Sequence, residues 1–163
     1  MLFLGDLPLG IDFPCGSFTL SRAEIIDFAS KYDPQPFHLD EDAAKASYFQ
    51  GLCASGLHTQ GAAIGLMVRA IQHVAVVAGY ALHEARFFMP VRPDTRYDVV
   101  ARWTGATPSP RDPTRGRAML TGEALLDGAV AMRFGVTYVV RRERTGWRAY
   151  PWSQAGARGN LLP

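Results

Sequence analysis

The chain contains little cysteine, and neither cysteine has a partner at a metal-binding spacing. Only Cys15 and Cys53 occur among its 163 residues, without a CxxC or Cys/His ligand pattern. This composition argues against a zinc site and is typical of a protein kept in a reducing compartment. We therefore expect a cytoplasmic protein without a zinc site. No other metal and no cofactor are expected either.

A long uninterrupted apolar run is also lacking. The longest apolar stretch begins at Leu57 and is interrupted by polar residues such as His58 and Arg69. That pattern argues against a membrane-spanning helix. The first ten residues include Asp6 and no basic residue, so they do not resemble a signal peptide. We expect no membrane association.

Lysine is scarce, because fifteen of the seventeen basic residues are arginine. The net charge is only +2, which gives no reason to expect a nucleic-acid partner. Residues 82–163 hold thirteen arginines and seven acidic residues. Arginine suits phosphate recognition, so this half is compatible with a phosphate-bearing carrier such as coenzyme A. Codon bias acting on solvated strands is a simpler explanation.

The length and the apolar content of 48% predict one globular domain over residues 1–163. Phe13–Leu20 has the pattern of a strand. Ser21, with Glu24 three residues later, forms a capping box that begins a helix. This helix must end near Tyr32, because two prolines follow in the segment Asp33-Pro34-Gln35-Pro36.

Two further helices are predicted before the chain turns to strands. Residues 39–44 form a short helix with acidic residues in its first turn. Leu57–His73 is apolar nearly all round, which indicates a buried helix, and it includes the small residues Gly61, Ala62, Ala63 and Gly65. These small residues would allow a sheet to approach closely.

The second half alternates in the manner of β-strands. Four strands are predicted there: Tyr80–Met89, Arg96–Thr104, Arg117–Asp127 and Ala129–Arg141. A hairpin turn is expected at Asp127-Gly128, and an exposed loop at Thr107–Arg115. One buried helix followed by antiparallel strands indicates an α+β fold in which the sheet wraps the helix. The predicted core covers about residues 13–140, and the tail 142–163 has no clear pattern.

Asp33 and His38 are the first candidate site residues. They place a carboxylate and an imidazole five residues apart on a loop stiffened by Pro34 and Pro36. Acid–base catalysis needs such groups held rigidly within reach of one substrate atom. A helix-ending turn at Asp33 and a capping or packing role for His38 would produce the same residues.

Ser55 is the second candidate, at the predicted start of the long helix. A serine there would cap the helix and leave free N–H groups around Gly56 and Leu57. Such an end binds an anion or a polarised carbonyl oxygen. An ordinary N-cap without a ligand explains the same pattern.

These segments together resemble the MaoC-like dehydratase and (R)-specific enoyl-CoA hydratase family. The family motif of Asp, two residues, Pro, one residue and His is matched by Asp33, Pro36 and His38. A small glycine-rich segment at 49–56 and an apolar strand that runs into Pro-Val-x-Pro-Asp, at 87–94, also match in the family's order. The resemblance covers about residues 13–140 and implies a hot-dog fold, an antiparallel sheet around a long central helix.

The resemblance implies a lyase that reversibly adds water to the double bond of a 2-enoyl-CoA thioester. Asp33 becomes the base for water, His38 its partner and proton donor, and the Gly56 N–H the oxyanion donor. The reverse division between Asp33 and His38 is also open. The remaining expected substrate contacts are Gln35, Pro36, Ser55, Leu57, His58 and Thr59, and a homodimer is implied.

The chain departs from the family pattern at two positions. Gln35 stands where the motif usually has Asn, and Ile64 stands where hydratases carry a serine on the helix. Either His58 or Thr59 supplies the missing polar contact, or the pocket has been repurposed. Alternative functions are a hot-dog acyl-CoA thioesterase and a non-catalytic subunit that binds acyl thioesters. Thioesterases usually carry an acid on the helix, and residues 57–72 contain none.

Overall fold

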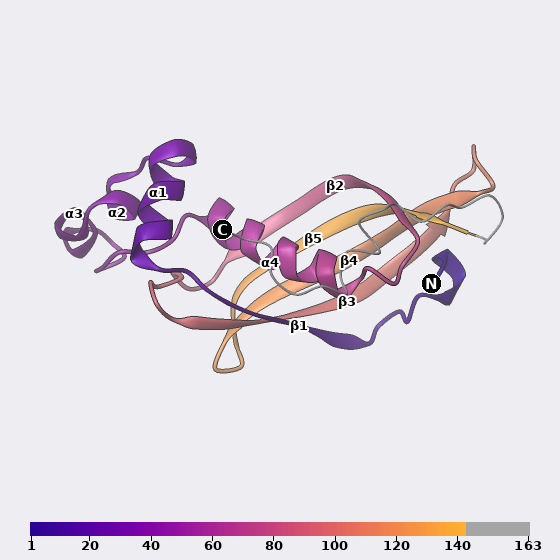
Figure 1. Cartoon of the computed structure of the whole chain (residues 1–163), viewed down its shortest axis with the longest axis horizontal. Helices are drawn as coiled ribbons and strands as arrows, with labels where there is room; N and C mark the ends of the chain where they lie inside the picture. Colours follow the sequence, from indigo (N-terminus) through magenta and orange to yellow (C-terminus); the bar gives the residue numbers. More distant parts are fainter. Residues whose placement is uncertain (143–163) are drawn as a thin grey trace, which may run out of the picture.

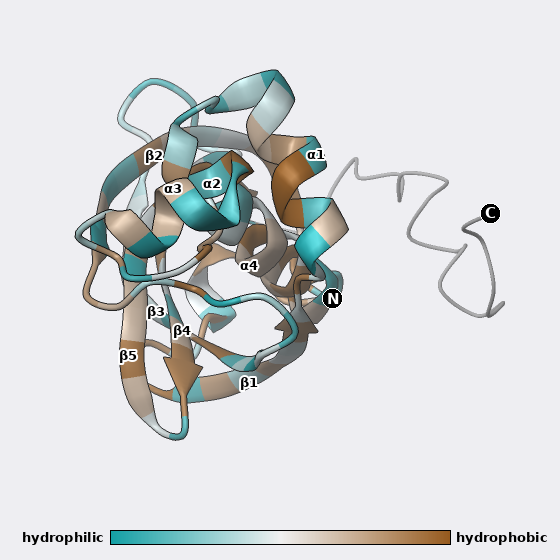
Figure 2. Ribbon diagram, turned by 90° about the vertical axis from the view of Figure 1, so that its left-hand side faces the viewer, coloured by the Kyte–Doolittle hydropathy of each residue, from teal (hydrophilic) through white to brown (hydrophobic). Residues whose placement is uncertain are grey.

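Five antiparallel strands curve around one long helix in the computed structural model, which describes residues 1–142 (Figure 1). The strand order is β1-β3-β4-β5-β2, so β1 and β2 form the edges. Figure 2 shows the strands as an arc around α4 (Gly56–Ala70). The strands are β1 (Asp12–Thr19), β2 (Val76–Phe87), β3 (Arg96–Pro108), β4 (Arg115–Leu126) and β5 (Ala129–Arg141). The predicted α+β class is confirmed. Residues 143–163 of the predicted tail lie outside the described residues.

Every predicted strand is present, and most are longer than expected. β2 begins at Val76 rather than Tyr80, and β3 continues to Pro108, which shortens the predicted loop. The hairpin turn between β4 and β5 is confirmed, because Asp127 and Gly128 have φ of 49° and 83°. Positive φ at both positions is the type I′ geometry that matches strand twist. A short 3-10 helix, η1 (Leu4–Asp6), was not predicted.

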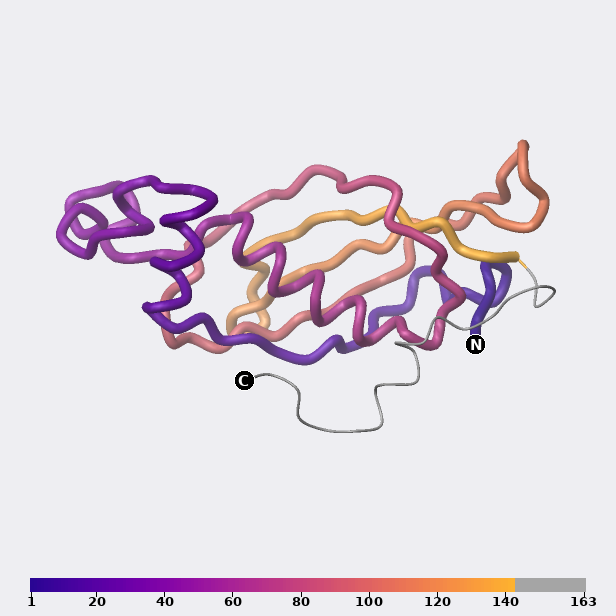
Figure 3. The backbone as a smooth tube through the Cα atoms, turned by 45° about the horizontal axis from the view of Figure 1, so that its top comes forward, coloured from indigo at the N-terminus to yellow at the C-terminus, as the bar shows by residue number. Residues whose placement is uncertain are grey.

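Three short helices form a separate layer at one end of the sheet (Figures 1 and 3). They are α1 (Arg22–Tyr32), α2 (Pro36–Leu39) and α3 (Glu41–Ala46). The capping box of α1 is confirmed, because the Glu24 N–H donates to Ser21 Oγ and the Ser21 N–H donates to the Glu24 carboxylate. The prediction that His38 lies on a loop is wrong, because Pro36 begins α2. Proline at a first helical position loses no hydrogen bond.

The third of these helices begins two residues later than predicted. Asp40 lies outside α3 and caps it, since its carboxylate accepts the Ala43 N–H at 2.8 Å. The side chain that was expected within the first turn therefore stabilises the helix from the preceding position.

The prediction that α4 is buried all round is wrong, because in a single chain part of its surface is exposed. The helix buries one side, formed by Thr59, Gln60, Ala63 and Met67, while Leu57 is 57% exposed. Gly61 has nothing within 4 Å of an added Cβ, so it does not provide the close approach to the sheet. That approach occurs at Gly122 of β4, where an added Cβ would lie 2.4 Å from the Met67 sulfur.

The apolar interior has two parts. One lies between α4 and the sheet and includes Trp103, Leu120 and Phe134. The other joins the short helices to the end of the sheet through residues such as Ile25 and Tyr97. The second part fixes α1 and α2 against the beginning of α4. No helix within residues 1–142 is long and apolar enough to cross a membrane.

Candidate active site

The end of α1 meets the beginning of α4 through two side chains. Asp33 is the C-cap of α1, and its N–H donates to the Ala29 carbonyl. Ser55 is the N-cap of α4 and is fully buried. The Ser55 hydroxyl donates to Oδ2 of Asp33 at 2.6 Å. Two predicted site residues, 22 positions apart in sequence, are thus in direct contact.

Gln35 binds the other oxygen of the same carboxylate. Its Nε2 donates to Oδ1 of Asp33 at 3.0 Å. The pKa of Asp33 is lowered, chiefly by the hydrogen bond from Ser55 and then by the one from Gln35. Burial acts in the opposite direction, and the nearby His38 lowers the pKa slightly further. Hydrogen bonds to the charged form favour it. Asp33 is therefore an oriented carboxylate at neutral pH.

His38 is held in one orientation by the backbone before α4. The side chain is buried, and Nδ1 lies 2.7 Å from the Cys53 carbonyl oxygen. A carbonyl oxygen can only accept, so Nδ1 carries the proton. In the neutral ring Nε2 then has a free lone pair, and it lies 3.5 Å from Oδ2 of Asp33. Both candidate acid–base groups therefore face the same point.

Gly56 begins α4 beside these two groups. The Ser55 hydroxyl accepts the Leu57 N–H at 3.2 Å. Among the described residues the Gly56 N–H has no acceptor, as expected for the first turn of a helix. The ring of Phe87 lies against Gly56, since an added Cβ would be 2.5 Å from it. Glycine at 56 therefore leaves room for the Phe87 ring at the start of the helix.

The other predicted contacts are more dispersed. Pro36 and Leu57 are exposed near the site, and contact with substrate remains a prediction for both. The Thr59 hydroxyl donates to the Ser55 carbonyl at 3.2 Å. The His58 ring stacks on Phe28 of α1, with centroids 4.4 Å apart. Burial lowers the pKa of His58, and its buried Nδ1 has no partner among residues 1–142.

That His58 or Thr59 supplies the polar contact of the family's helix serine stays a prediction. Neither side chain contacts Asp33, whereas Ser55 does. Ile64 packs against the apolar interior. A hydroxyl that precedes the helix, rather than one within it, supplies the polar contact to the carboxylate.

Sequence reasoning missed two residues of the site. Cys53 contributes its backbone carbonyl, which any residue type could supply, so the sequence carries no signal for it. Phe87 lies at the end of β2, 31 residues after Gly56, and only the curvature of the sheet brings the two together.

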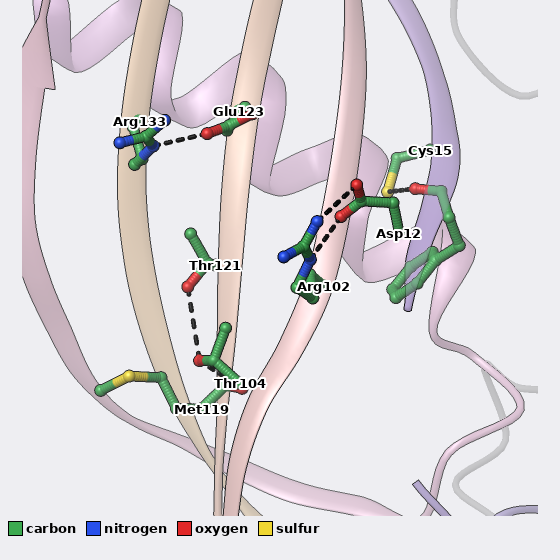
Figure 4. Close-up of polar contacts among 9 residues, drawn as sticks. Asp12, Cys15, Arg102, Thr104, Met119, Thr121, Glu123 and Arg133 are labelled. Atoms are coloured by element: carbon green, nitrogen blue, oxygen red, sulfur yellow. Dashed lines mark hydrogen bonds and ion pairs between the residues drawn. The ribbon is translucent and has the colours of Figure 1, made fainter. Parts of the chain in front are cut away.

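A second polar cluster lies on the outer face of the sheet, on the side opposite α4 (Figure 4). Arg102 binds both carboxylate oxygens of Asp12, and Arg133 binds Glu123. These residues line a cavity of about 380 Å³. Each guanidinium here is already paired with a carboxylate, so the cluster is a weaker candidate for chemistry. Among residues 1–142 no three His, Cys, Asp or Glu side chains form a metal-binding group.

Known proteins share this fold and part of this sequence. The MaoC like domain matches residues 15–117. A MaoC-like dehydratase from Rhodospirillum rubrum superposes with a TM-score of 0.80 at 35% identity, covering 88% of this chain and 99% of its own. An (R)-hydratase from A. caviae involved in PHA biosynthesis has a TM-score of 0.65 at 21% identity, covering 81% and 96%, and shares the fold.

A curated relative is "Uncharacterized protein YdeM" of Bacillus subtilis (strain 168). It is 32% identical over 92 residues, which are 56% of this chain and 65% of the relative's length. The domain match covers more than half of the chain and contains Asp33, His38 and Gly56. The chain therefore belongs to the MaoC-like domain family, and its fold is the hot-dog fold of the MaoC-like dehydratases.

Proposed function

We propose that this protein is a hydratase that adds water reversibly to the double bond of a 2-enoyl thioester. The observation that carries the proposal is the convergence of Asp33 and His38 beside the free N–H of Gly56 at the start of α4. The family supports it, because its solved relatives include a MaoC-like dehydratase and an (R)-hydratase.

The attacking water lies between the carboxylate and the imidazole. Nε2 of neutral His38 accepts one proton as the water oxygen bonds to C3 of the enoyl group. The resulting imidazolium, stabilised by Asp33, gives that proton to C2, so one water is added and no charge remains. The lowered pKa of Asp33 makes it a weak base, which favours His38 as the base and Asp33 as the group that orients the water.

Negative charge develops on the thioester oxygen when water adds to C3. The free N–H of Gly56 and the positive end of the α4 dipole stabilise that charge. The Phe87 ring lies against Gly56 at the same helix end.

A 2-enoyl-CoA is the proposed substrate, and the reaction needs no cofactor. The test is to add the protein to such a thioester and follow the absorbance of the conjugated double bond. Loss of absorbance, unaffected by a chelator, supports the proposal. Release of free thiol would instead indicate a thioesterase. Equilibrium binding without turnover would indicate a non-catalytic subunit.

The protein is also proposed to be a homodimer that associates through the β2 edge. β2 has a strand neighbour on one side only and carries exposed apolar side chains, with Tyr80 55% and Leu82 62% exposed. An unpaired edge with apolar residues is suited to pairing with another strand. Phe87 ends the same strand, so a second copy would pack close to the site.

A further inference from the structure

Arg92 connects the segment after β2 to the segment before α4 through its guanidinium group. Nη1 donates to the carbonyls of Gly51 and Leu52 at 2.6 and 3.2 Å. Nη2 donates to the Phe49 carbonyl at 2.5 Å. One side chain therefore binds three carbonyl groups within four consecutive residues.

The backbone of this segment is shaped around the guanidinium. Gln50 has φ of 55° and Gly51 has φ of 155°, within the segment whose carbonyls at 49, 51 and 52 accept from the guanidinium. A Cβ added at Gly51 would lie 3.2 Å from Nη1 of Arg92. A residue with φ in this region strains its backbone unless it is glycine. Gln50, a non-glycine residue with positive φ, lies between two residues whose carbonyls Arg92 binds.

The next residues of the segment hold the candidate catalytic groups. Cys53 accepts the hydrogen bond that fixes His38, and Ser55 donates the one that orients Asp33. We infer that Arg92 is a positioning residue of this site, one that sets the orientation of His38 and Asp33 through the backbone at 49–55. Its catalytic consequence depends on the proposed hydratase function, whereas its effect on His38 does not.

Arginine is needed at this position for a geometric reason. Three acceptors are served by a planar fork with several donors, which a lysine ammonium on a flexible stem cannot reproduce. No carboxylate among residues 1–142 lies within ion-pair distance of Arg92, so carbonyl dipoles are its partners. The hydrogen bond from the Ala54 N–H to Val91 does not involve its side chain and remains when Arg92 is replaced.

The test compares Arg92→Met and Arg92→Lys with the control Arg102→Met. Arg102 also makes short side-chain hydrogen bonds, to Asp12, but lies on the outer face of the sheet. The direct measurement is the ¹⁵N NMR spectrum of the His38 ring, assigned by comparison with His38→Gln. We expect one tautomer with the proton on Nδ1 in the wild type and in Arg102→Met, and a mixture of tautomers in both Arg92 variants.

Turnover of a 2-enoyl-CoA is measured on the same proteins. Arg92→Met should lower kcat by about a hundredfold with a smaller change in KM, and Arg92→Lys should lose less. A His38 spectrum that stays as in the wild type in both variants would overturn the inference, even if their melting temperatures fall. If the wild type does not hydrate any enoyl thioester, the proposed function fails, and the His38 spectra still decide the role of Arg92. If Arg92→Met does not fold, the His38 spectrum of Arg92→Lys decides it.

Discussion

The Ser55 hydroxyl joins the start of α4 to the end of α1 by donating to Asp33 at 2.6 Å while it accepts the Leu57 N–H. A single oxygen thus caps the helix and lowers the pKa of the carboxylate. Replacement of Ser55 with Ala should therefore have two separable effects. The lost cap should cost about 0.5–2 kcal/mol of unfolding free energy, measured by urea denaturation.

The second effect of Ser55→Ala is on pH dependence. Loss of the hydrogen bond should raise the pKa of Asp33 toward its ordinary value of 3.8 or above. The carboxylate then becomes protonated at a higher pH, so any acid limb of the kcat/KM profile that reports Asp33 should move to higher pH. An unchanged limb, with the stability loss present, would show that Asp33 does not govern it.

Replacement of Asp33 with Asn should lower the rate of enoyl-CoA hydration by about a hundred- to ten-thousandfold. The amide keeps the shape of the side chain and still accepts from Ser55, so the melting temperature should change little. The matched control is Asp27→Asn, because Asp27 lies on the same helix and forms an exposed ion pair with Lys31 at 2.7 Å. Full activity in Asp33→Asn would contradict the assignment.

Replacement of Gly56 with Ala tests whether the close packing of Phe87 on the start of α4 matters for catalysis. The added Cβ would overlap the Phe87 ring, so we expect a lower kcat. The double variant with Phe87→Ala removes this overlap and should recover part of the lost rate. If the double variant is slower than Gly56→Ala alone, then Phe87 contributes to the site beyond its bulk, and the steric explanation is insufficient.

Replacement of His58 with Phe should leave activity near the wild-type level. The new ring can keep the stack on Phe28 and removes a buried nitrogen that has no partner among the described residues. Unfolding free energy should be unchanged or higher. A large loss of kcat/KM, with stability intact, would instead support the sequence-based prediction that His58 contacts substrate.

Replacement of Leu82 with Lys tests the proposed dimer. Leu82 is exposed on the β2 edge, and a charge there should oppose strand pairing. We expect a lower molar mass in sedimentation and reduced activity, since the site lies near the proposed interface. Tyr48→Ser is the control, because Tyr48 is 95% exposed and lies away from β2. A wild-type monomer at working concentration would exclude the dimer.

Local patterns in the sequence were sufficient for most of the fold. The capping box at Ser21, the two prolines after Asp33 and the Asp127-Gly128 turn act over a few residues, so their outcomes were predictable. The nearly uniform apolar character of α4 was misleading, because it does not show which side meets the sheet. Gly122 provides the closest approach, and its role depends on a strand that lies opposite Met67.

By itself, the sequence determined the α+β class, the residues proposed as the acid–base pair and the serine that caps α4. Only the tertiary structure decided that Ser55, rather than a residue within the helix, binds Asp33, and that the Cys53 carbonyl fixes the tautomer of His38. The tertiary structure also decided that Phe87 contacts Gly56 and that Arg92 binds the carbonyls of Phe49, Gly51 and Leu52. The physical reason is range: caps and turns depend on neighbours in sequence, whereas these hydrogen bonds join segments that only the packing of the sheet, α1 and α4 brings together.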